Sequence, residues 1–348
     1  MGPDDRKCIG QNFAPANVPI QHANPASLSL SSESEWIMTA PYRFTPQHML
    51  TGGDNLSAES AAAQMEATGD YKILRRLTPP QPYACTSPNC RHAAFLDVET
   101  TGLDDDDEII ELAIVPFQYS LDGVICGIGE VFDQFNEPTR PISEEITRLT
   151  GITPEMVRGQ AIDKNKVRSI LSGTDLIIAH HAGFDRPKCE AFMEEFAAKP
   201  WACSLNDIDW RSEGHESAKL SFLAMEYGFF FSGHRADIDC YAGIKLLTMP
   251  LASTGQLALS CLLGSARKSG WRVFAVDADY ASKDTLKQRG YRWAPAEARP
   301  HPKCWWIDID DEALEDEMTF LETEVYKRPT RPPVYKIDGL NRHSRRIG

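Results

Sequence analysis

The pattern of apolar and polar positions changes near residue 92 of this chain. Residues 1–60 are rich in Ser, Ala, Pro, Asn and Gln, and their apolar residues follow no sustained period, which predicts a mostly disordered segment. Residues 61–91 begin with a weak helical pattern and end in a Pro-rich stretch. We therefore expect a short helix within residues 57–77, followed by a linker.

From residue 92 to residue 250, short apolar runs alternate with amphipathic segments. The short runs predict buried strands, and Leu121-Asp122-Gly123 predicts a hairpin turn. Ser143 and Thr153-Pro154 are typical of helix N-termini. The expected strands are 93–98, 109–117, 124–132, 175–179 and 201–204, and the main expected helices are 143–149, 167–171, 187–198, 217–227 and 235–247. Three strands in a meander, followed by alternating helices and strands, predict an α/β fold with helices packed on a mixed sheet.

A second pattern predicts a small α+β module over residues 265–326, whose role the sequence leaves open. We expect strands at 271–276, 291–293 and 304–309, and helices at 282–289 and 311–326. Its Trp residues and basic residues are compatible with stacking of single-stranded bases, but we favour a second interpretation, in which they form the core of a small domain. Residues 327–348 contain seven Lys or Arg and one Asp, which predicts a basic, disordered tail.

Composition limits the functional classes. The net charge of the 348 residues is -14, made up of 20 basic and 36 acidic residues in 1–266 and of 16 and 14 in 267–348. Such a charge argues against a protein that coats long duplexes, but it is compatible with an enzyme that binds a short strand through metal ions. There is no apolar run of about 18 residues and no signal-peptide core, so we expect a cytoplasmic protein without a membrane span.

The cysteines predict reduced thiols. The chain has 9 Cys, scattered and odd in number, which does not favour a disulfide framework. Cys85, Cys90 and His92 raise the possibility of a zinc site. No second pair of ligands follows at a suitable spacing, so we interpret Cys85 and Cys90 as unpaired thiols of the linker.

Candidate chemistry begins with two acids at the end of the first strand. Because side chains alternate along a strand, Asp97 and Glu99 point to the same face. Two carboxylates at this spacing repel each other unless a cation neutralises them, and oxygen ligands suit Mg²⁺ or Mn²⁺. A solvated strand end is the alternative. The five acidic residues at 104–108 show no ligand spacing, and we interpret them as a solvated loop.

Two further segments add acids and a histidine. Asp185 follows an apolar strand and a loop, where it is either a metal ligand or a helix N-cap. His234 lies in a Gly-containing loop, and Asp239 lies about one turn inside the next helix. An acid on a mainly apolar helix face needs a partner such as a metal. Asp237 should point elsewhere, to the surface.

Together these residues predict a nuclease centre. Four carboxylates suffice to hold two divalent ions about 3.5–4 Å apart, as in two-metal nucleases. One ion would activate a water, and the other would stabilise the leaving 3′ oxygen. A neutral imidazole can accept the proton of that water, so His234 is the candidate general base.

Three motifs in order, Phe95-Leu96-Asp97-Val98-Glu99-Thr100-Thr101-Gly102-Leu103, His180-His181-Ala182-Gly183-Phe184-Asp185 and His234-Arg235-Ala236-Asp237-Ile238-Asp239, resemble the DEDDh exonucleases. That group includes the epsilon proofreading subunit of bacterial DNA polymerase III, and the resemblance covers about residues 92–248. It implies a ribonuclease H-like fold and release of nucleoside monophosphates from nucleic-acid 3′ ends, as in proofreading or DNA repair. The closer resemblance is to stand-alone epsilon-like exonucleases with a C-terminal extension.

The resemblance also implies roles for individual residues. Asp97, Glu99, Asp185 and Asp239 would bind two Mg²⁺ or Mn²⁺ ions, with His234 as the base. The candidate substrate-binding residues are Thr100, Thr101, Gly102, Leu103, His181 and Phe184. His181 is a departure, because the family usually has Asn at this position. We expect DNA with single-stranded ends as substrate; an exoribonuclease, an oligonucleotide-trimming enzyme and a non-catalytic nucleic-acid-binding protein remain alternatives, and a polymerase partner stays open.

Overall fold

The computed structural model describes residues 57–294, 301 and 303–347, so the expected disorder before residue 57 lies outside the described residues. Helix α1 (Ala58–Glu66) begins at Ser57, whose side chain accepts a hydrogen bond from the Ser60 amide at 3.2 Å. The helix is shorter than expected, because β1 (Arg75–Arg76) pairs in parallel with β8 (Phe229–Phe230). Within the described part of the chain, none of the helices has the length and apolar character that a membrane crossing requires.

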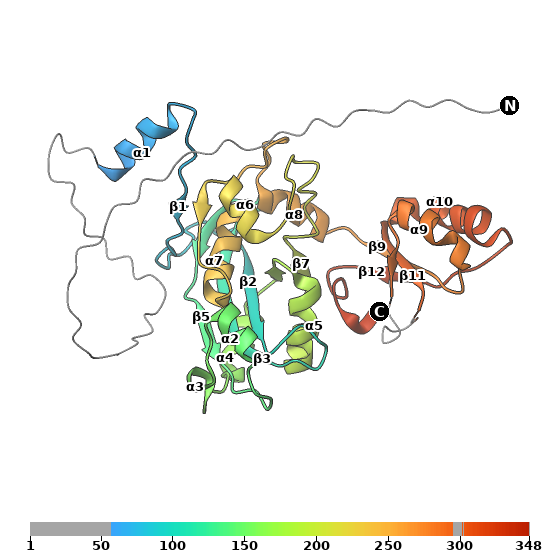
Figure 1. Ribbon diagram of the computed structural model, residues 1–348, viewed down its shortest axis with the longest axis horizontal. Coiled ribbons are helices and arrows are strands. Elements are labelled where there is room, and N and C mark those ends of the chain that lie inside the picture. Colours follow the sequence, from blue (N-terminus) through green and yellow to red (C-terminus); the bar gives the residue numbers. More distant parts are fainter. Residues whose placement is uncertain (1–56, 295–300, 302, 348) are drawn as a thin grey trace, which may run out of the picture. The chain divides into compact units, whose positions relative to one another are not determined.

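A six-stranded mixed sheet forms the centre of the fold (Figure 1). Its order is β4-β3-β2-β6-β7, and β5 also pairs with β3. The first four strands are antiparallel, whereas β6 runs parallel to β2 and β7 runs parallel to β6. The strands are β2 (Arg91–Thr100), β3 (Ile109–Tyr119), β4 (Ile125–Ile128), β5 (Phe132–Phe135), β6 (Leu176–Ala179) and β7 (Trp201–Cys203). The predicted α/β fold with a mixed sheet is confirmed, and the single strand expected at 124–132 is divided into β4 and β5.

Alternation along β2 builds two separate cores. Ala93 and Phe95 pack on one face against α6 (Leu220–Glu226), α7 (Ala236–Leu247) and α8 (Ala258–Ala266). Ala94 and Leu96 pack on the opposite face against α4 (Lys164–Ser172) and α5 (Ala182–Phe192). Helices therefore cover both faces of the sheet, as Figure 1 shows. The remaining elements of this part are α2 (Glu144–Thr150), α3 (Pro154–Val157) and the short helix η1 (Glu194–Ala198).

Capping explains several of the helix boundaries. The Ser143 side chain accepts from the Ile146 amide at 3.2 Å and starts α2, as predicted. Pro154 stands at the first position of α3, also as predicted. Helix α5 was expected to begin at Pro187, but it begins at Ala182 with Pro187 inside it. This earlier start places Asp185 in the first turn of α5 and excludes the interpretation of Asp185 as an N-cap.

Residues 270–337 form a second, four-stranded sheet in the order β10-β11-β9-β12. Tyr291 and Trp305 are buried in its core, which confirms the structural interpretation for part of the aromatic set. Trp293 stays half exposed, and the Arg272 and Arg292 guanidinium groups lie over the Trp306 ring. The elements are β9 (Gly270–Ala275), η2 (Tyr280–Ser282), α9 (Lys283–Arg289), β10 (Arg292–Trp293), β11 (Trp305–Asp310), η3 (Asp311–Ala313), α10 (Leu314–Phe320), η4 (Leu321–Tyr326), β12 (Val334–Ile337) and η5 (Arg345–Ile347).

The expected disorder of residues 327–348 is wrong for the part that the structure describes. Strand β12 pairs with β9 from Val334 to Ile337 and so completes the second sheet. The basic charges of this segment also find acidic partners elsewhere, for example Lys336 with Asp311 at 3.7 Å. A run of basic residues therefore does not by itself indicate a disordered tail, because such residues can also form ion pairs with acidic residues of the folded chain.

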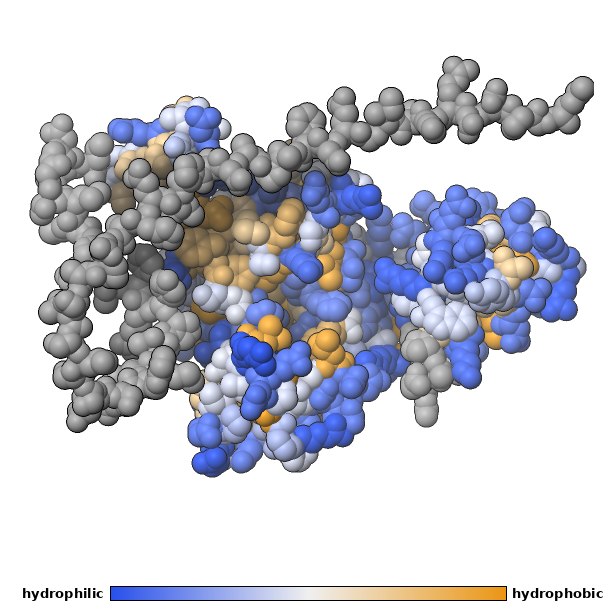
Figure 2. All heavy atoms as spheres, viewed as in Figure 1, coloured by the Kyte–Doolittle hydropathy of each residue, from blue (hydrophilic) through white to orange (hydrophobic). Residues whose placement is uncertain are grey.

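Hydrophilic and apolar residues are distributed differently over the two sheets and their helices. In the face that Figure 2 shows, hydrophilic residues cover most of the second sheet and its helices, and an apolar area lies over α6 and α7. Phe230 and Met225, which belong to β8 and α6, are among the exposed large apolar residues.

Helix α7 packs on the sheet at a glycine. A Cβ added to Gly243 would overlap the Phe95 ring of β2, so α7 can approach the sheet this closely only because residue 243 has no side chain. The constraint is steric rather than conformational, because Gly243 lies within a regular helix. It sets the distance between β2 and the helix that contains Asp239.

We predict that Gly243→Ala destabilises the protein by about 1–3 kcal/mol, the usual cost of overpacking a core. Gly264→Ala in α8 is the matched control, since a Cβ there meets no atom within 4 Å, and it should stabilise by about 0.5–1 kcal/mol. Chemical denaturation of both variants measures the difference. Equal stability of the two variants would show that the Phe95 contact does not limit the packing of α7.

Candidate active site

The predicted acids meet at the end of β2 on the α7 side of the sheet. Asp97 and Glu99 continue the face of Phe95, and α7 brings Asp239 to the same place. One carboxylate oxygen from each of these three residues lies within 4.8 Å of the other two. Within the described ranges, the only other such group of potential metal ligands consists of cysteines.

Asp185 lies beside this group, on α5, but is not one of the residues whose ligand atoms lie within 4.8 Å of one another. Its carboxylate is buried, and backbone amides at Val98 and His181 hydrogen-bond to it. Asp185 is also the largest of the neighbouring charges that raise the pKa of Asp97. The structure therefore brings together all four predicted acids, from β2, α5 and α7.

Burial is the main electrostatic feature of the site. It raises the pKa of Glu99 to about 8, of Asp185 to about 8 and of Asp239 to about 7, and repulsion among the carboxylates adds to each shift. The same two causes raise the pKa of Asp97 well above its usual range. Four acids with these pKa values cannot all be ionised near neutral pH without a compensating cation. The donor set of carboxylate oxygens fits hard divalent ions such as Mg²⁺ or Mn²⁺.

His234 lies on the loop immediately before α7. Its φ of 66° is left-handed, and the amide of the next residue, Arg235, donates to the Asp239 carboxylate at 3.2 Å. The His234 side chain is exposed to solvent. His234 is thus adjacent to one of the acids but is not one of the buried groups. Its proposed role as a base rests on this position.

The two histidines before α5 have different environments. His180 is held by the Ser204 hydroxyl at 3.0 Å and by the Ala218 carbonyl at 2.8 Å, and burial lowers its pKa to about 4. It is therefore a neutral structural residue, as expected. His181 is exposed and stacks with Phe184 at a centroid distance of 6.2 Å and an interplanar angle of 14°.

The other predicted substrate residues form a turn after β2. The Thr100 hydroxyl donates to the Gly102 carbonyl at 2.6 Å, and the Thr101 hydroxyl donates to Asp107 at 2.8 Å. Both hydroxyls therefore stabilise the turn itself. Leu103, by contrast, is 82% exposed and offers an apolar surface beside the acids.

The acidic loop at 104–108 is attached to α5 by a lysine. The buried Lys188 ammonium donates to the carbonyls of Asp104 and of Asp107, the latter at 2.9 Å. The loop carboxylates bind protein groups, as when Glu108 accepts from the Thr139 hydroxyl at 2.6 Å. None of them joins a group of potential metal ligands within the described ranges, which agrees with the sequence interpretation.

Glu111 is a buried acid beside the site that the sequence analysis did not single out. It lies on β3 directly opposite Glu99 and is fully buried. The Arg235 side chain donates to its Oε1 at 3.0 Å and 2.7 Å, and the Ala236 amide donates to its Oε2 at 3.0 Å. Glu111 thereby fixes the first residues of α7, between His234 and Asp239. The signal in the sequence was an acid inside the otherwise apolar run of residues 109–117.

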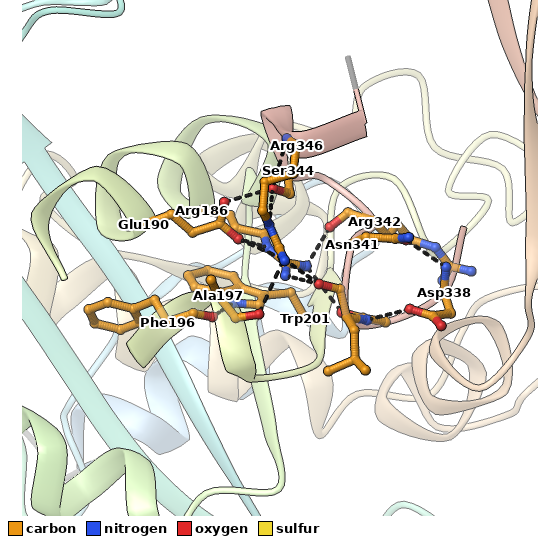
Figure 3. A network of polar contacts seen from close by, with 12 residues as sticks. Arg186, Glu190, Phe196, Ala197, Trp201, Asp338, Asn341, Arg342, Ser344 and Arg346 are labelled. Carbon is orange, nitrogen blue, oxygen red and sulfur yellow. Dashed lines mark hydrogen bonds and ion pairs between the residues drawn. The ribbon is translucent and has the colours of Figure 1, made fainter. Parts of the chain in front are cut away.

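The C-terminal segment is bound to α5 through Arg186 and Glu190, as Figure 3 shows. The buried Arg186 guanidinium donates to the carbonyls of Gly339 at 3.1 Å, of Arg342 at 2.6 Å and of Leu340. Glu190, one turn further along α5, accepts from Arg186 at 2.7 Å and from the Ser344 hydroxyl at 2.6 Å. Because Arg186 follows Asp185 directly, the C-terminal segment stabilises the helix that positions one of the four acids.

With this geometry established, comparison with known proteins is informative. Residues 94–247 match the protein-family model described as RNase_T: Exonuclease. A DNA polymerase III PolC-type of Staphylococcus haemolyticus is 31% identical over 172 residues, 46% of this chain and 11% of that protein. The PolC-type polymerase of Listeria welshimeri is 43% identical over 95 residues, 26% of this chain and 6% of that protein. The chain thus spans only about a tenth of the length of these relatives.

Solved structures give a more distant likeness. Exonuclease X in complex with 5′ overhanging duplex DNA is 23% identical, with a TM-score of 0.36 over 48% of this chain and 99% of that chain. The Escherichia coli Exonuclease I complex with single-stranded DNA is 18% identical, with a TM-score of 0.44 over 65% and 66%. The family match and the polymerase relatives concern the same part of the chain: residues 94–247 form a domain of the DEDD 3′→5′ exonuclease type.

The raised pKa values predict how stability depends on pH. A carboxyl whose folded pKa lies above its ordinary value near ~4 stabilises the fold only while it is protonated, so the metal-free protein should lose thermal stability as pH rises from about 4 to about 8. Mn²⁺ should restore stability, and more so at the higher pH, because fewer protons then compete with the ion. Thermal unfolding in chelator and in Mn²⁺ across this range tests both statements. The double variant Asp97→Asn/Glu99→Gln should show a flatter profile; a wild-type profile no steeper than that would contradict the prediction.

The Glu111–Arg235 pair supports a second prediction. Arg235→Gln leaves the buried Glu111 carboxylate without its cation, so we expect a loss of about 2–4 kcal/mol, below the upper range for buried pairs because Arg235 is partly exposed. Adding Glu111→Gln should recover part of the loss. Arg140→Gln, which breaks the exposed pair with Asp106, should cost under about 1 kcal/mol. A double variant that is less stable than Arg235→Gln would show that the charge of Glu111 is not what Arg235 compensates.

Proposed function

We propose that this chain removes nucleoside monophosphates from the 3′ end of DNA in a metal-dependent reaction, with single-stranded ends favoured. One observation supports it above the others: four carboxylates from three separate elements converge, one of them buried and three partly buried, where burial and the neighbouring carboxylates raise every pKa. A protein gains nothing in stability from such a cluster, so we infer that its purpose is to bind cations.

Asp97, Glu99, Asp185 and Asp239 are the proposed ligands of two Mg²⁺ or Mn²⁺ ions. Bound there, the ions would supply an activated water and neutralise the charge that develops on the leaving 3′ oxygen. The protein's own contribution is to keep the four carboxylates close in a buried place, where charges interact more strongly than in water. Glu111 contributes as a positioning residue, through its contacts with Arg235 and Ala236.

His234 is the proposed general base. The amide of the next residue, Arg235, donates to Asp239, so the place of His234 relative to the acids follows that of α7. Its exposed imidazole can take a proton from a water beside the acids and pass the proton to solvent. This division gives four residues the role of ligands and one residue the role of base.

The residues beside the acids suggest how a terminal nucleotide is held. Since both Thr hydroxyls are engaged within the turn, we assign contacts with the nucleotide to the backbone of Thr101 and Gly102 and to the exposed Leu103 side chain. The stacked pair of His181 and Phe184 offers a second flat surface, on which a base can stack. His181 would thus replace the usual Asn with a ring.

The relatives' names support DNA over RNA, because they are DNA polymerases. From the same names we infer a role in proofreading or repair. A ribonuclease or oligonucleotide-trimming activity of the same domain, and a non-catalytic binding function, are the alternatives that the following experiment separates.

We expect the purified chain with Mg²⁺ or Mn²⁺ to release mononucleotides from 3′-labelled single-stranded DNA at once, and to shorten 5′-labelled DNA progressively. Asp97→Asn should lower the rate more than about a hundredfold, since even residues that only support metal ligands account for 10–100-fold. Asp70→Asn, at an exposed position near α1, is the matched control and should keep full activity. Matched RNA strands, duplexes and mismatched ends complete the set of substrates.

The outcomes are distinct. Faster cleavage of RNA would replace the DNA assignment with an exoribonuclease. Metal-independent binding of a strand without cleavage, unaffected by His234→Ala, would identify a binding protein. Cleavage that begins at the 5′ end would contradict the proposed polarity. Full activity of a folded Asp97→Asn variant would remove the proposed metal site.

A further inference from the structure

Three cysteines from two distant segments meet outside the active site. Cys85 and Cys90 belong to the linker before β2, and Cys126 belongs to β4. Their three sulfur atoms lie within 4.8 Å of one another, and the Sγ atoms of Cys90 and Cys126 are 3.2 Å apart. The structure joins Cys85 to Cys90 in a disulfide, contrary to the expectation of unpaired linker thiols. The spacing of cysteines in the sequence did not indicate that Cys126 would lie beside Cys85 and Cys90.

Local structure directs Cys126 into this cluster. Gln118 pairs with Gly127 and Tyr119 pairs with Ile125, so Cys126 is the extra residue of a β-bulge. A bulge turns the side chain of its extra residue away from the regular alternation of the strand. Cys126 therefore points to a place that the pattern of residues 124–132 could not indicate.

The linker is held against the same bulge. Tyr83 and Ile128 exchange two backbone hydrogen bonds of 2.8 Å, and the Cys85 amide donates to Gln118 Oε1 at 2.8 Å. A Cβ at residue 127 would lie 2.7 Å from the Cys85 nitrogen, so this approach requires Gly127. The fold thus brings the linker close enough for its two sulfurs to reach the third.

The arrangement fits a metal ion better than a permanent disulfide. The Cα atoms of Cys85 and Cys90 are 7.2 Å apart, whereas disulfides usually span about 4.4–6.8 Å. Thiolates on one tetrahedral zinc, with bonds of about 2.3 Å, are separated by roughly 3.8 Å, so the Cys90 and Cys126 sulfurs, 3.2 Å apart, need to separate only slightly to share one ion. Soft thiolates favour Zn²⁺, in contrast to the carboxylates of the active site.

We propose that Cys85, Cys90 and Cys126, once reduced, bind one structural Zn²⁺ that fastens the linker to β4. A dithiol reductant supplies two electrons and two protons, is itself oxidised to a disulfide, and converts the Cys85–Cys90 disulfide into two thiols; zinc then displaces the protons of the three thiols. His92 is assigned to the fourth position, and its exposed ring must turn to reach it, because its nitrogens are not among the atoms within 4.8 Å of one another. Its Nε2 lies 3.1 Å from the Gln118 side chain that also binds the Cys85 amide, and a Cys₃His set is a common structural zinc site.

The test uses the full chain, purified with a reductant and without chelator. Elemental analysis should find about one zinc per chain, and exchange for Co²⁺ should give a sulfur-to-metal charge-transfer band in the near ultraviolet. Carboxylates cannot produce that band, so it should persist in Asp97→Asn/Glu99→Gln, which separates this site from the proposed active-site ions.

Cys126→Ser should abolish the band and lower zinc affinity more than about a hundredfold, while Cys261→Ser, a free cysteine of α8, should change neither. His92→Gln should weaken binding without abolishing it; unchanged affinity would overturn the assignment of the fourth ligand. Circular dichroism checks the folding of Cys126→Ser, and Cys85→Ser, which lies outside the main sheet, repeats the test if that variant does not fold.

Two results would overturn the proposal. The first is a reduced wild-type protein that shows no charge-transfer band with Co²⁺ and no more zinc than Cys126→Ser. The second is a Cys85–Cys90 disulfide that persists in excess reductant while Cys126 stays free. Neither result depends on nuclease activity, so this proposal and the proposed function fail or succeed separately.

Discussion

The crowding of four carboxylates into a largely desolvated place at one end of β2 is the constraint on which the rest of this structure depends. Asp97, Glu99, Asp185 and Asp239 all resist ionisation in this place, because burial and mutual charge oppose it. A fold can keep such a cluster only if surrounding contacts hold the elements in position. Most of the polar contacts described around the site serve that purpose.

Each element that supplies an acid is fixed by a different kind of contact. Helix α7 is placed by close packing at Gly243 and by the contacts of its first residues with Glu111. Helix α5 is held by Lys188 on the carbonyls of the acidic loop and by Arg186 on those of the C-terminal segment. Buried cations bound to carbonyl oxygens thus surround an anionic centre without neutralising it, which leaves the carboxylates available for metal ions.

The C-terminal segment changes how the charge of the chain is understood. Its basic residues are engaged with the acidic body, as in the contacts of Arg345 with Asp105 and of Arg346 with Glu190. The segment therefore adds stability near α5 rather than a free positive surface. For this part of the chain, net charge by itself was a poor guide to interaction with nucleic acids.

The sequence by itself determined the carboxylate site and the fold around it. Alternation along β2 is local, so Asp97 and Glu99 had to share a face, and the three ordered motifs indicated their partners. Only the tertiary structure decided which contacts form between segments that are distant in the sequence. The burial of Glu111 against Arg235, the capture of the tail by Arg186 and the turn of Cys126 toward Cys90 each join residues from separate elements. The periodicity of apolar residues cannot predict such contacts, because they depend on a bulge, a buried charge or a strand pairing that exists only once the chain has folded.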